Sequence, residues 1–166
     1  DGVIEYTHRN HYTIADWLPN NHALLYDATR EIGGNKVQTM TKTIDRPGFY
    51  KKNGVPDSLL GCAPGKETLS VAYIPTSALM FIKEKLRGGE IVSIVTTLPG
   101  IVSAHMGLIA RDQWGNVIFR HASSSPQTHE VTDFRFDDYV DKLATSKSRV
   151  GMIFMRVRET HNSPKE

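Results

Sequence analysis

The second half of the chain is a series of short apolar and β-branched runs separated by turn residues, and this pattern limits the fold more than any other feature. Leu-Pro-Gly at residues 98–100 and Asp-Gln-Trp-Gly-Asn at residues 112–116 are typical of tight turns. Runs joined this closely pair as antiparallel strands. We therefore expect strands at residues 90–97, 103–111, 117–121, 128–132 and 150–157, with the continuous apolar run at 90–97 in the centre of the sheet.

The first half of the chain combines helical and extended patterns. Apolar spacing and flanking glycines predict helices at residues 23–32 and from Thr76 or Ser77, as the capping residue, to Leu86. Strands are expected at residues 37–44, closed by a turn at residues 46–48, and at residues 69–74, with a long surface loop at residues 51–66. A further short helix is expected at residues 136–143. Helices grouped with an antiparallel sheet indicate the α+β class. The length suits one domain, residues 1–166, ending in a flexible polar tail at 160–166.

Charge and hydropathy argue against two kinds of partner. The net charge is only +2, and the basic residues are interspersed with Asp and Glu, so we expect no nucleic-acid binding. No apolar run approaches the roughly 18 residues that a membrane-spanning helix needs, so no membrane span is expected. The only cysteine, Cys62, cannot form a disulfide within the chain.

Two histidines fall on neighbouring expected strands, where an acid–base pair is plausible. His105 lies near the start of one strand and His121 at the end of the next, so a hairpin between them brings these ends together. Sixteen positions separate the two residues, and this even number places both side chains on one face of an unbulged hairpin. One imidazole could then take a proton from a nucleophile while the other orients it, with small neighbours such as Gly107 leaving space for substrate. The spacing alone also fits two structural histidines at strand ends.

The segments around these histidines resemble the NlpC-type, papain-like superfamily of cysteine peptidases. Members typically have a Gly-Asp-hydrophobic strand, a Ser-His-Val-Gly strand and a His-Ala strand. Glu90 stands where aspartate is usual and Met106 where valine is usual, and both are mild departures. The matching segments are Gly89-Glu90-Ile91-Val92, Ser103-Ala104-His105-Met106-Gly107 and Phe119-Arg120-His121-Ala122-Ser123.

Within that superfamily, the sequence resembles the N-acetylmuramoyl-L-alanine amidase-like family over nearly its whole length. This resemblance implies a papain-like core, in which an antiparallel sheet packs against helices, with family-specific insertions. Besides the histidine segments, it is carried by Arg9-Asn10-His11-Tyr12, Asp16-Trp17, Asn20-Asn21, Thr29, Ile32-Gly33-Gly34, Tyr73-Ile74-Pro75 and Val150-Gly151-Met152-Ile153 with Arg156.

The resemblance also implies an activity. Family members hydrolyse the amide between N-acetylmuramic acid and L-alanine, here in peptidoglycan fragments (muropeptides), by a Cys-His-His mechanism. A cysteine thiolate attacks the carbonyl, His105 is the general base and later the acid, and His121 orients His105. Neither a metal nor an organic cofactor is implied, and the expected location is periplasmic or secreted.

The family nucleophile is a cysteine at a helix N-terminus, in an Asp-Cys-hydrophobic-Thr motif ahead of the Arg9 segment. A helix N-terminus favours a thiolate through its dipole and free N–H groups. The 166 residues contain no such motif, so we expect this cysteine before Asp1, or that it has been lost. Cys62 also precedes both histidines, but its surroundings, Gly61-Cys62-Ala63-Pro64-Gly65, are loop-like, and we interpret it as a bystander thiol.

Several polar and aromatic residues are candidates for substrate contact. Arginine suits carboxylates and aromatic faces suit sugars, whereas a packed N-terminal segment is the structural alternative. Hydroxyl groups flanking the loop before His105 could bind substrate or satisfy turn backbone. The candidates are Arg9, His11, Tyr12, Trp17, Thr97 and Ser103.

Two other functions compete with the amidase. The first is a non-catalytic module that binds peptidoglycan or muropeptides and has lost its nucleophile. The second is a metal-dependent hydrolase in which His105 and His121 are ligands, although the sequence offers no cluster at zinc-ligand spacing.

Overall fold

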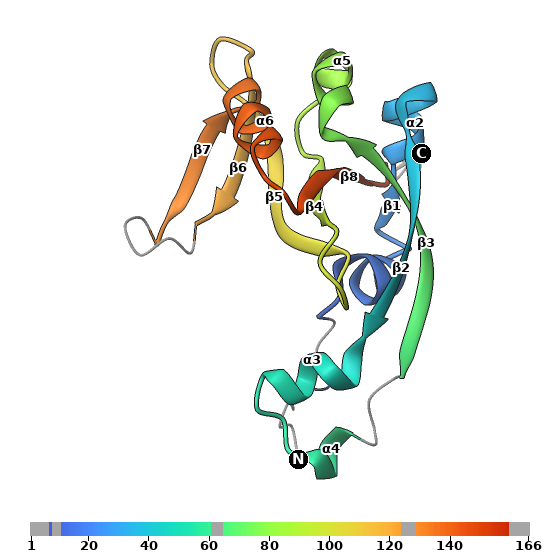
Figure 1. Ribbon diagram of the computed structural model, residues 1–166. Coiled ribbons are helices and arrows are strands. Elements are labelled where there is room, and N and C mark those ends of the chain that lie inside the picture. Colours follow the sequence, from blue (N-terminus) through green and yellow to red (C-terminus); the bar gives the residue numbers. More distant parts are fainter. Residues whose placement is uncertain (1–6, 8–10, 61–64, 124–128, 160–166) are drawn as a thin grey trace, which may run out of the picture.

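One antiparallel sheet organises the protein (Figure 1). The computed structural model describes residues 7, 11–60, 65–123 and 129–159. In this part of the chain the strand order is β2-β3-β8-β4-β5-β6-β7. The remaining strand, β1, pairs with the last residues of β8. The strands are β1 (Leu25–Asp27), β2 (Gln38–Asp45), β3 (Lys66–Pro75), β4 (Ile91–Thr96), β5 (Ser103–Arg111), β6 (Val117–Ala122), β7 (Val131–Arg135) and β8 (Arg149–Val157).

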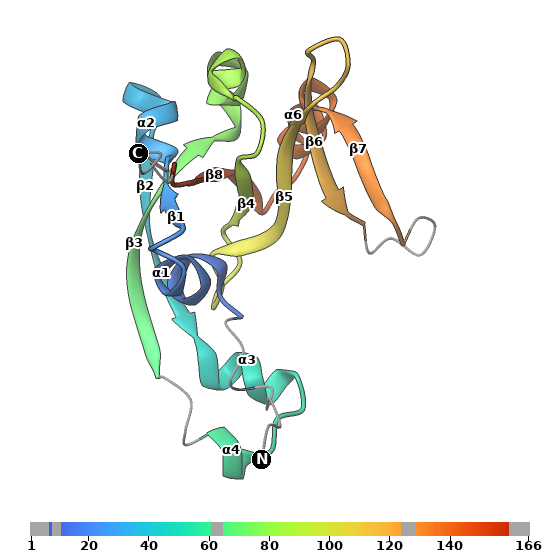
Figure 2. The ribbon, with the colours of Figure 1, turned by 180° about the vertical axis from the view of Figure 1, so that it is seen from behind.

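Short helices surround this sheet. A π-helical turn at Thr13–Trp17 leads into α1, and 3-10 turns at Thr76–Ala78 and Lys83–Lys85 flank α5. Figure 1 shows α6 in front of the sheet, and Figure 2, from behind, shows α1 in front of it. The helices are α1 (Leu18–Asn20), α2 (Thr29–Gly33), α3 (Arg46–Lys52), α4 (Asp57–Leu60), α5 (Leu79–Ile82) and α6 (Phe136–Ala144).

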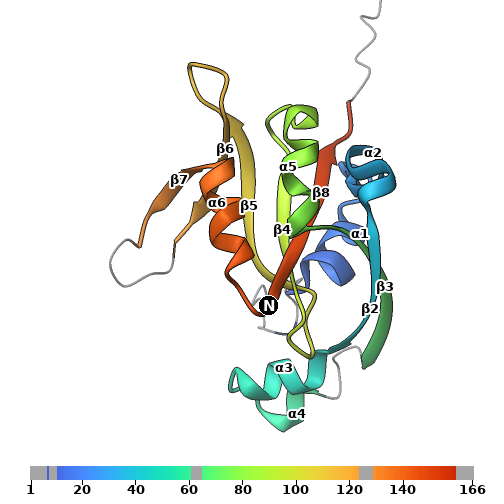
Figure 3. The same ribbon diagram turned by 45° about the horizontal axis from the view of Figure 1, so that its top comes forward.

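Alternating side chains divide the sheet into two buried faces. In β4, Val92 and Ile94 join one apolar cluster, whereas Val95 joins the other. The first cluster lies beneath α5 and α6, which lie together over the sheet in Figure 3, and we call this side the α6 face. It includes Ile94, Ile109, Phe119, Phe136, Tyr139, Met152 and Phe154. The opposite side, which we call the α1 face, includes Tyr12, Ile44, Val71, Val95, Val102 and Ile153.

The predicted mixed α and β character and most of the predicted strands are confirmed. The 103–111 strand has the predicted bounds, and β4 lies between β8 and β5, as its continuous apolar run indicated. The 37–44, 69–74, 117–121 and 150–157 strands and the 136–143 helix are present with small changes at their ends.

The helix predicted at residues 23–32 is wrong in its first half. Residues Leu25–Asp27 form β1, which pairs with residues Met155–Val157 at the end of β8, and only Thr29–Gly33 are helical. Pairing with a distant strand therefore outweighs the local helical pattern.

The turn predicted at residues 46–48 is also wrong, because α3 begins there. Asp45 caps the helix by accepting a hydrogen bond from the Gly48 N–H at 3.0 Å, and Pro47 stands in the first turn, where a missing N–H costs nothing. The loop expected at residues 51–66 contains the end of α3, the helix α4 and the start of β3.

Two smaller predictions need correction. The strand expected at residues 128–132 begins at Val131, and neither Thr76 nor Ser77 caps the following helical segment with its side chain. Arg9, Cys62 and the expected tail at 160–166 lie outside the described residues. Among the helices of the described residues, none is both long and apolar enough to cross a membrane.

Candidate active site

The β5–β6 hairpin brings the two predicted histidines together. Its register pairs Leu108 with Arg120 and, continued by one residue, places His121 opposite Gly107. His105 lies two residues before Gly107 in β5. The histidines are therefore diagonal neighbours on one face, as their even spacing predicted. His105 also pairs with Ile94 of β4, whose side chain belongs to the α6 face.

The imidazole rings of these residues are hydrogen-bonded to each other. Nε2 of His105 lies 2.9 Å from Nδ1 of His121, and the ring planes meet edge to face at 84°. No described residue is hydrogen-bonded to Nδ1 of His105, and this atom is not among the buried polar atoms that lack a partner. Nδ1 of His105 is therefore the ring atom that remains accessible for proton transfer.

Gly107 makes the close packing between these strands possible. A Cβ at this position would lie 2.6 Å from Cε2 of Phe119 and 2.7 Å from the carbonyl oxygen of Arg120. The ring of Phe119 thus occupies the space that a side chain would need. The expectation that Gly107 leaves room for substrate is therefore wrong, since its role is to admit Phe119 beside His121.

Three aromatic side chains pack around the ring of His121. Phe119 and Phe134 stack against it at centroid distances of 5.5 and 5.6 Å, with interplanar angles of 28° and 15°. Tyr139 of α6 closes the group at 5.9 Å. These contacts fix the orientation of His121 and shield it from water.

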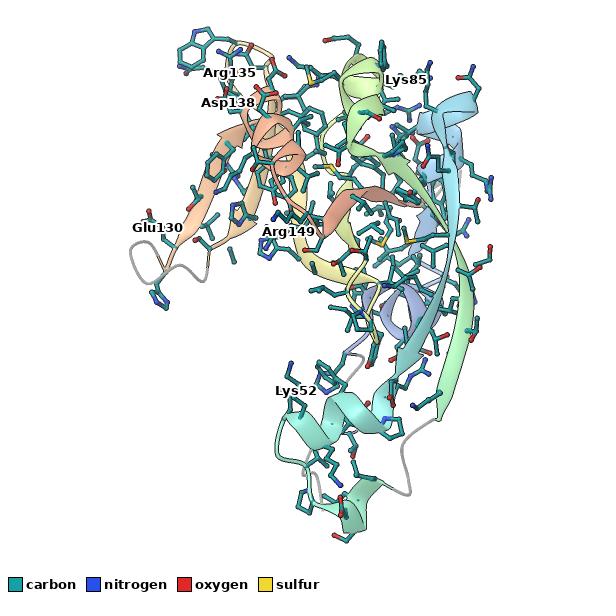
Figure 4. All side chains as sticks on the ribbon, viewed as in Figure 1. Lys52, Lys85, Glu130, Arg135, Asp138 and Arg149 are labelled. Atoms are coloured by element: carbon teal, nitrogen blue, oxygen red, sulfur yellow. The ribbon has the colours of Figure 1, made fainter. Side chains whose placement is uncertain are left out.

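The surroundings of His105 favour its neutral form. Burial lowers its pKa from the ordinary value of 6.5, and the positive charges of His121, when protonated, and of Arg149 act in the same direction. Arg149 lies at the start of β8, where the chain has just left α6 (Figure 4). A neutral imidazole near pH 7 can accept a proton, which a general base requires.

The hydrogen bond between the rings needs one N–H group and one lone pair. When Nε2 of His105 carries the proton, it donates the hydrogen bond and Nδ1 of His121 accepts this bond. The lone pair on Nδ1 of His105 is then free. The same arrangement stabilises the imidazolium that forms when His105 takes up a proton, because Nε2–H then donates to His121 more strongly. The pair can therefore act as a base with an orienting partner.

Three of the predicted substrate residues line one small hollow. His11, Tyr12 and Ser103 surround a cavity of about 130 Å³, together with Phe49 of α3 and Ile101. The ring of His11 packs 5.6 Å from that of Phe49. The sequence prediction thus grouped residues that are close in space.

The hollow and the histidine pair lie on opposite faces of the sheet. A register shift in the β4–β5 pairing places Ser103 opposite Val95, although His105 is opposite Ile94. The Oγ atoms of Ser103 and Ser93 are 2.6 Å apart on the α1 face. Ser103 therefore points away from His105, even though only one residue separates them.

Tyr12 also has a structural role, and the remaining substrate candidates are more dispersed. Tyr12 is buried, its hydroxyl donates to the Asp45 carbonyl at 3.1 Å, and burial raises its pKa to about 12 against the opposing charge of Arg46. Trp17, half-buried, ends the π-helical turn, and the exposed Thr97 lines a separate hollow of about 320 Å³ beside β2. Arg9 lies outside the described residues.

The substitution of Glu90 for the usual aspartate has a structural explanation. Its carboxylate is buried and accepts hydrogen bonds from the Arg87 and Gly88 N–H groups and from Arg156 at 2.8 Å. Burial alone would raise the pKa of Glu90, but these hydrogen bonds outweigh it and lower the pKa. Arg156 also contacts Glu31 at 2.6 Å, so this group fixes the end of β8 rather than the histidines.

Sequence reasoning missed the residues that surround the histidines. Phe134, Tyr139 and Arg149 come from β7, α6 and β8, and only the folded chain brings them to β5 and β6. The alternation in β6 and β7, with Phe119 paired to Phe134, was a signal that could have located one of them.

A shared metal ion does not fit the observed orientation of the rings. Nε2 of His105 and Nδ1 of His121 point at each other, whereas two ligands must point at a common third position. Among the described residues, no group of three or more His, Cys, Asp or Glu side chains is arranged to hold a metal.

Comparison with solved structures defines the fold class. A Legionella pneumophila protein assigned to the DUF1460 family superposes with a TM-score of 0.78 at 23% identity, over 95% of this chain and 65% of that one. An N-acetylmuramoyl-L-alanine amidase from Bacteroides uniformis gives 0.72 at 24% identity, over 95% and 68%. A Bacteroides fragilis protein named as a candidate xylanase gives 0.67 at 25% identity, over 94% and 70%. The chain thus shares their α+β fold and spans about two thirds of their length.

The family follows from the sequence comparison. Residues 1–146 match the sequence model of the AmiA-like, N-acetylmuramoyl-L-alanine amidase-like family, so the chain belongs to this family. A search of curated proteins gave no match.

Proposed function

We propose that this chain carries the general base of a cysteine-dependent amidase of the NlpC-type, papain-like superfamily. The amidase hydrolyses the bond between N-acetylmuramic acid and L-alanine in peptidoglycan fragments. The observation that carries the proposal is the 2.9 Å contact between Nε2 of His105 and Nδ1 of His121, which leaves Nδ1 of His105 available. Membership of the amidase-like family supports the substrate class. A periplasmic or secreted location would bring the protein to that substrate.

The nucleophile in this proposal is a cysteine thiol ahead of Asp1. This chain covers 65% and 68% of two solved structures with this fold, so those proteins contain residues that have no counterpart here. Cys62 is the weaker candidate, because proline and glycine follow it closely in a segment unsuited to begin a helix.

The residues would divide the reaction as follows. Nδ1 of His105 takes the thiol proton, and the thiolate sulfur attacks the lactyl carbonyl carbon of the muramic acid. As the C–N bond breaks, His105 returns the proton to the amino group of L-alanine, which leaves a thioester. His105 then takes a proton from water, whose oxygen attacks the thioester carbonyl. The C–S bond breaks, which leaves the lactyl carboxyl group of the muramic acid, and His105 returns the proton to the sulfur to restore the thiol. His121 holds His105 in position throughout.

The hollow lined by His11, Tyr12 and Ser103 supports a role in binding substrate away from the scissile bond. It opens beside the first residue of β5, and His105 follows on the same strand. A substrate that passes around this strand end could contact both faces. We include Arg9, Trp17 and Thr97 in the proposed binding surface because of their side-chain chemistry, and Arg9 and Trp17 also lie in segments that resemble the family.

The test is hydrolysis of a muramoyl-L-alanyl peptide by the full-length protein, followed by mass spectrometry of the released peptide. Iodoacetamide should abolish activity, and His105→Ala should lower kcat/KM by about 10²–10⁴-fold, the usual contribution of a general base. His22→Ala is the matched control, because His22 is exposed and its side chain is hydrogen-bonded only to the Pro19 carbonyl among the described residues.

Three results would contradict the proposal. Unchanged activity in His105→Ala would exclude this residue as the base, and loss of activity in EDTA would instead favour the metal-dependent hydrolase. Tight binding of the peptide with no turnover, by protein that includes the residues before Asp1, would favour the non-catalytic binding module.

A further inference from the structure

Two buried polar atoms without hydrogen-bond partners lie on the neighbouring strands β6 and β7, and one of them belongs to the histidine pair. They are Nε2 of His121 and Oγ1 of Thr132, which lack a partner within the described part of the chain. The β6–β7 register pairs these two residues directly. Directly opposed residues of an antiparallel pair have Cβ atoms about 4.5–5.5 Å apart.

Both side chains lie on the α6 face. In the same register, Phe119 pairs with Phe134, and both pack into the cluster beneath α6. His121 and Thr132 are each two residues from these aromatic residues on their own strands, so they share this face. Thr132 is thus the direct neighbour of His121 across the β6–β7 pair, on the same face of the sheet.

An unpaired buried polar atom is unfavourable, and these two are chemically complementary. A threonine hydroxyl can donate and accept, and each imidazole nitrogen does one or the other. Rotation of the Thr132 side chain, or one ordered water between the atoms, would satisfy both. The phenylalanine rings around His121 provide no alternative acceptor.

We propose that Thr132 is a positioning residue, whose hydroxyl oxygen accepts the Nε2–H of His121 directly or through one water and so maintains the tautomer that keeps His105 basic. This inference rests on the proposed function. With Nε2 of His121 protonated, its Nδ1 must accept from Nε2–H of His105, and the lone pair on Nδ1 of His105 is free. The chain of hydrogen bonds runs from His105 through His121 to Thr132.

The hydroxyl matters most when His105 becomes protonated. The imidazolium must donate through Nε2, so Nδ1 of His121 must accept and the proton of His121 must lie on Nε2. Without Thr132, this state leaves an N–H group buried and unpaired, which is rare in folded proteins. The other tautomer, with the proton of His121 on Nδ1, would then be favoured, and Nδ1 of His105 would carry a proton instead of a lone pair.

The test compares Thr132→Val, which replaces the hydroxyl by a methyl group of similar shape, with Thr132→Ser, which retains the hydroxyl. Imidazole ¹⁵N chemical shifts of the full-length protein report which nitrogen of His121 and His105 is protonated. We expect protonated Nε2 on His121 in wild type and Thr132→Ser, and protonated Nδ1 in Thr132→Val. We also expect kcat/KM to fall about tenfold in Thr132→Val, the effect of one lost hydrogen bond, and to stay within about threefold in Thr132→Ser.

Tyr139→Phe is the control for the other hydroxyl near His121. The inference is overturned if Thr132→Val leaves the tautomers unchanged, if Thr132→Ser changes them equally, or if Tyr139→Phe produces the same shift. Because the NMR measurement needs no substrate, it separates failure of this inference from failure of the proposed amidase activity. A purely structural role of Thr132 would alter the melting temperature and leave the tautomers as they are.

Discussion

Replacing Gly107 by alanine should destabilise the sheet and separate the two histidines. The added Cβ would lie 2.6 Å from Cε2 of Phe119 and 2.7 Å from the carbonyl oxygen of Arg120. Both distances are shorter than 3.0 Å, a separation that Cβ atoms in proteins essentially never go below, so these neighbours would have to move. Phe119 is buried and cannot swing into solvent, and the Arg120 carbonyl belongs to the backbone of β6. The substitution therefore has to push β5 and β6 apart.

The size of the effect follows from these two contacts. Overpacking a well-packed core costs about 1–3 kcal/mol, and a clash with backbone as well as a buried ring places Gly107→Ala near about 3 kcal/mol. For a chain of this size, about 1 kcal/mol lowers Tm by roughly 2–4 °C. We thus expect Tm to fall by roughly 6–12 °C. The proposed amidase activity should also be lost, because His121 stacks on the displaced Phe119.

The assay is thermal unfolding of wild type, Gly107→Ala and Gly65→Ala. Gly65 is the matched control, because its added Cβ would meet no atom within 4 Å among the residues that the structure describes. We expect Gly65→Ala to stay within about 1 kcal/mol of wild type. If both variants unfold within about 2 °C of each other, the packing argument for Gly107 is refuted.

Two further predictions concern charge. Arg149→Gln removes a positive charge near His105, so the pKa of His105 should rise but stay below 6.5, because burial, the larger cause, is unchanged. NMR titration of the His105 ring measures this pKa, and a fall in its value would contradict the prediction. Glu90→Ala should lower the free energy of unfolding by about 3–5 kcal/mol, because the buried Arg156 loses its buried partner. Glu31→Ala, which removes the half-exposed partner of Arg156, should cost no more than about 1 kcal/mol in the same denaturation experiment, and equal losses would refute the distinction.

Local sequence determined the strands that carry the histidines. Short apolar runs and tight turns predicted β5, and the even spacing of His105 and His121 predicted a shared face. These predictions succeeded because strand alternation and hairpin turns depend on residues close in sequence. The helix predicted at 23–32 failed, because β1 forms only by pairing with the distant β8.

Other features of the site depended on the tertiary structure alone. The register shift that turns Ser103 away from His105 involves the pairing of β4 with β5, and spacing within one strand cannot reveal it. Likewise, Tyr139 and Thr132 reach His121 through the packing of α6 and the register of β7.

The sequence by itself therefore determined the strand pattern and the pair of imidazoles as candidates for acid–base chemistry. Only the tertiary structure decided which nitrogen of His105 is free, what surrounds His121 and which face of the sheet holds the hollow. The physical reason is that periodicity fixes the side of a strand on which a residue lies, whereas hydrogen-bond partners and burial depend on contacts between segments far apart in the chain.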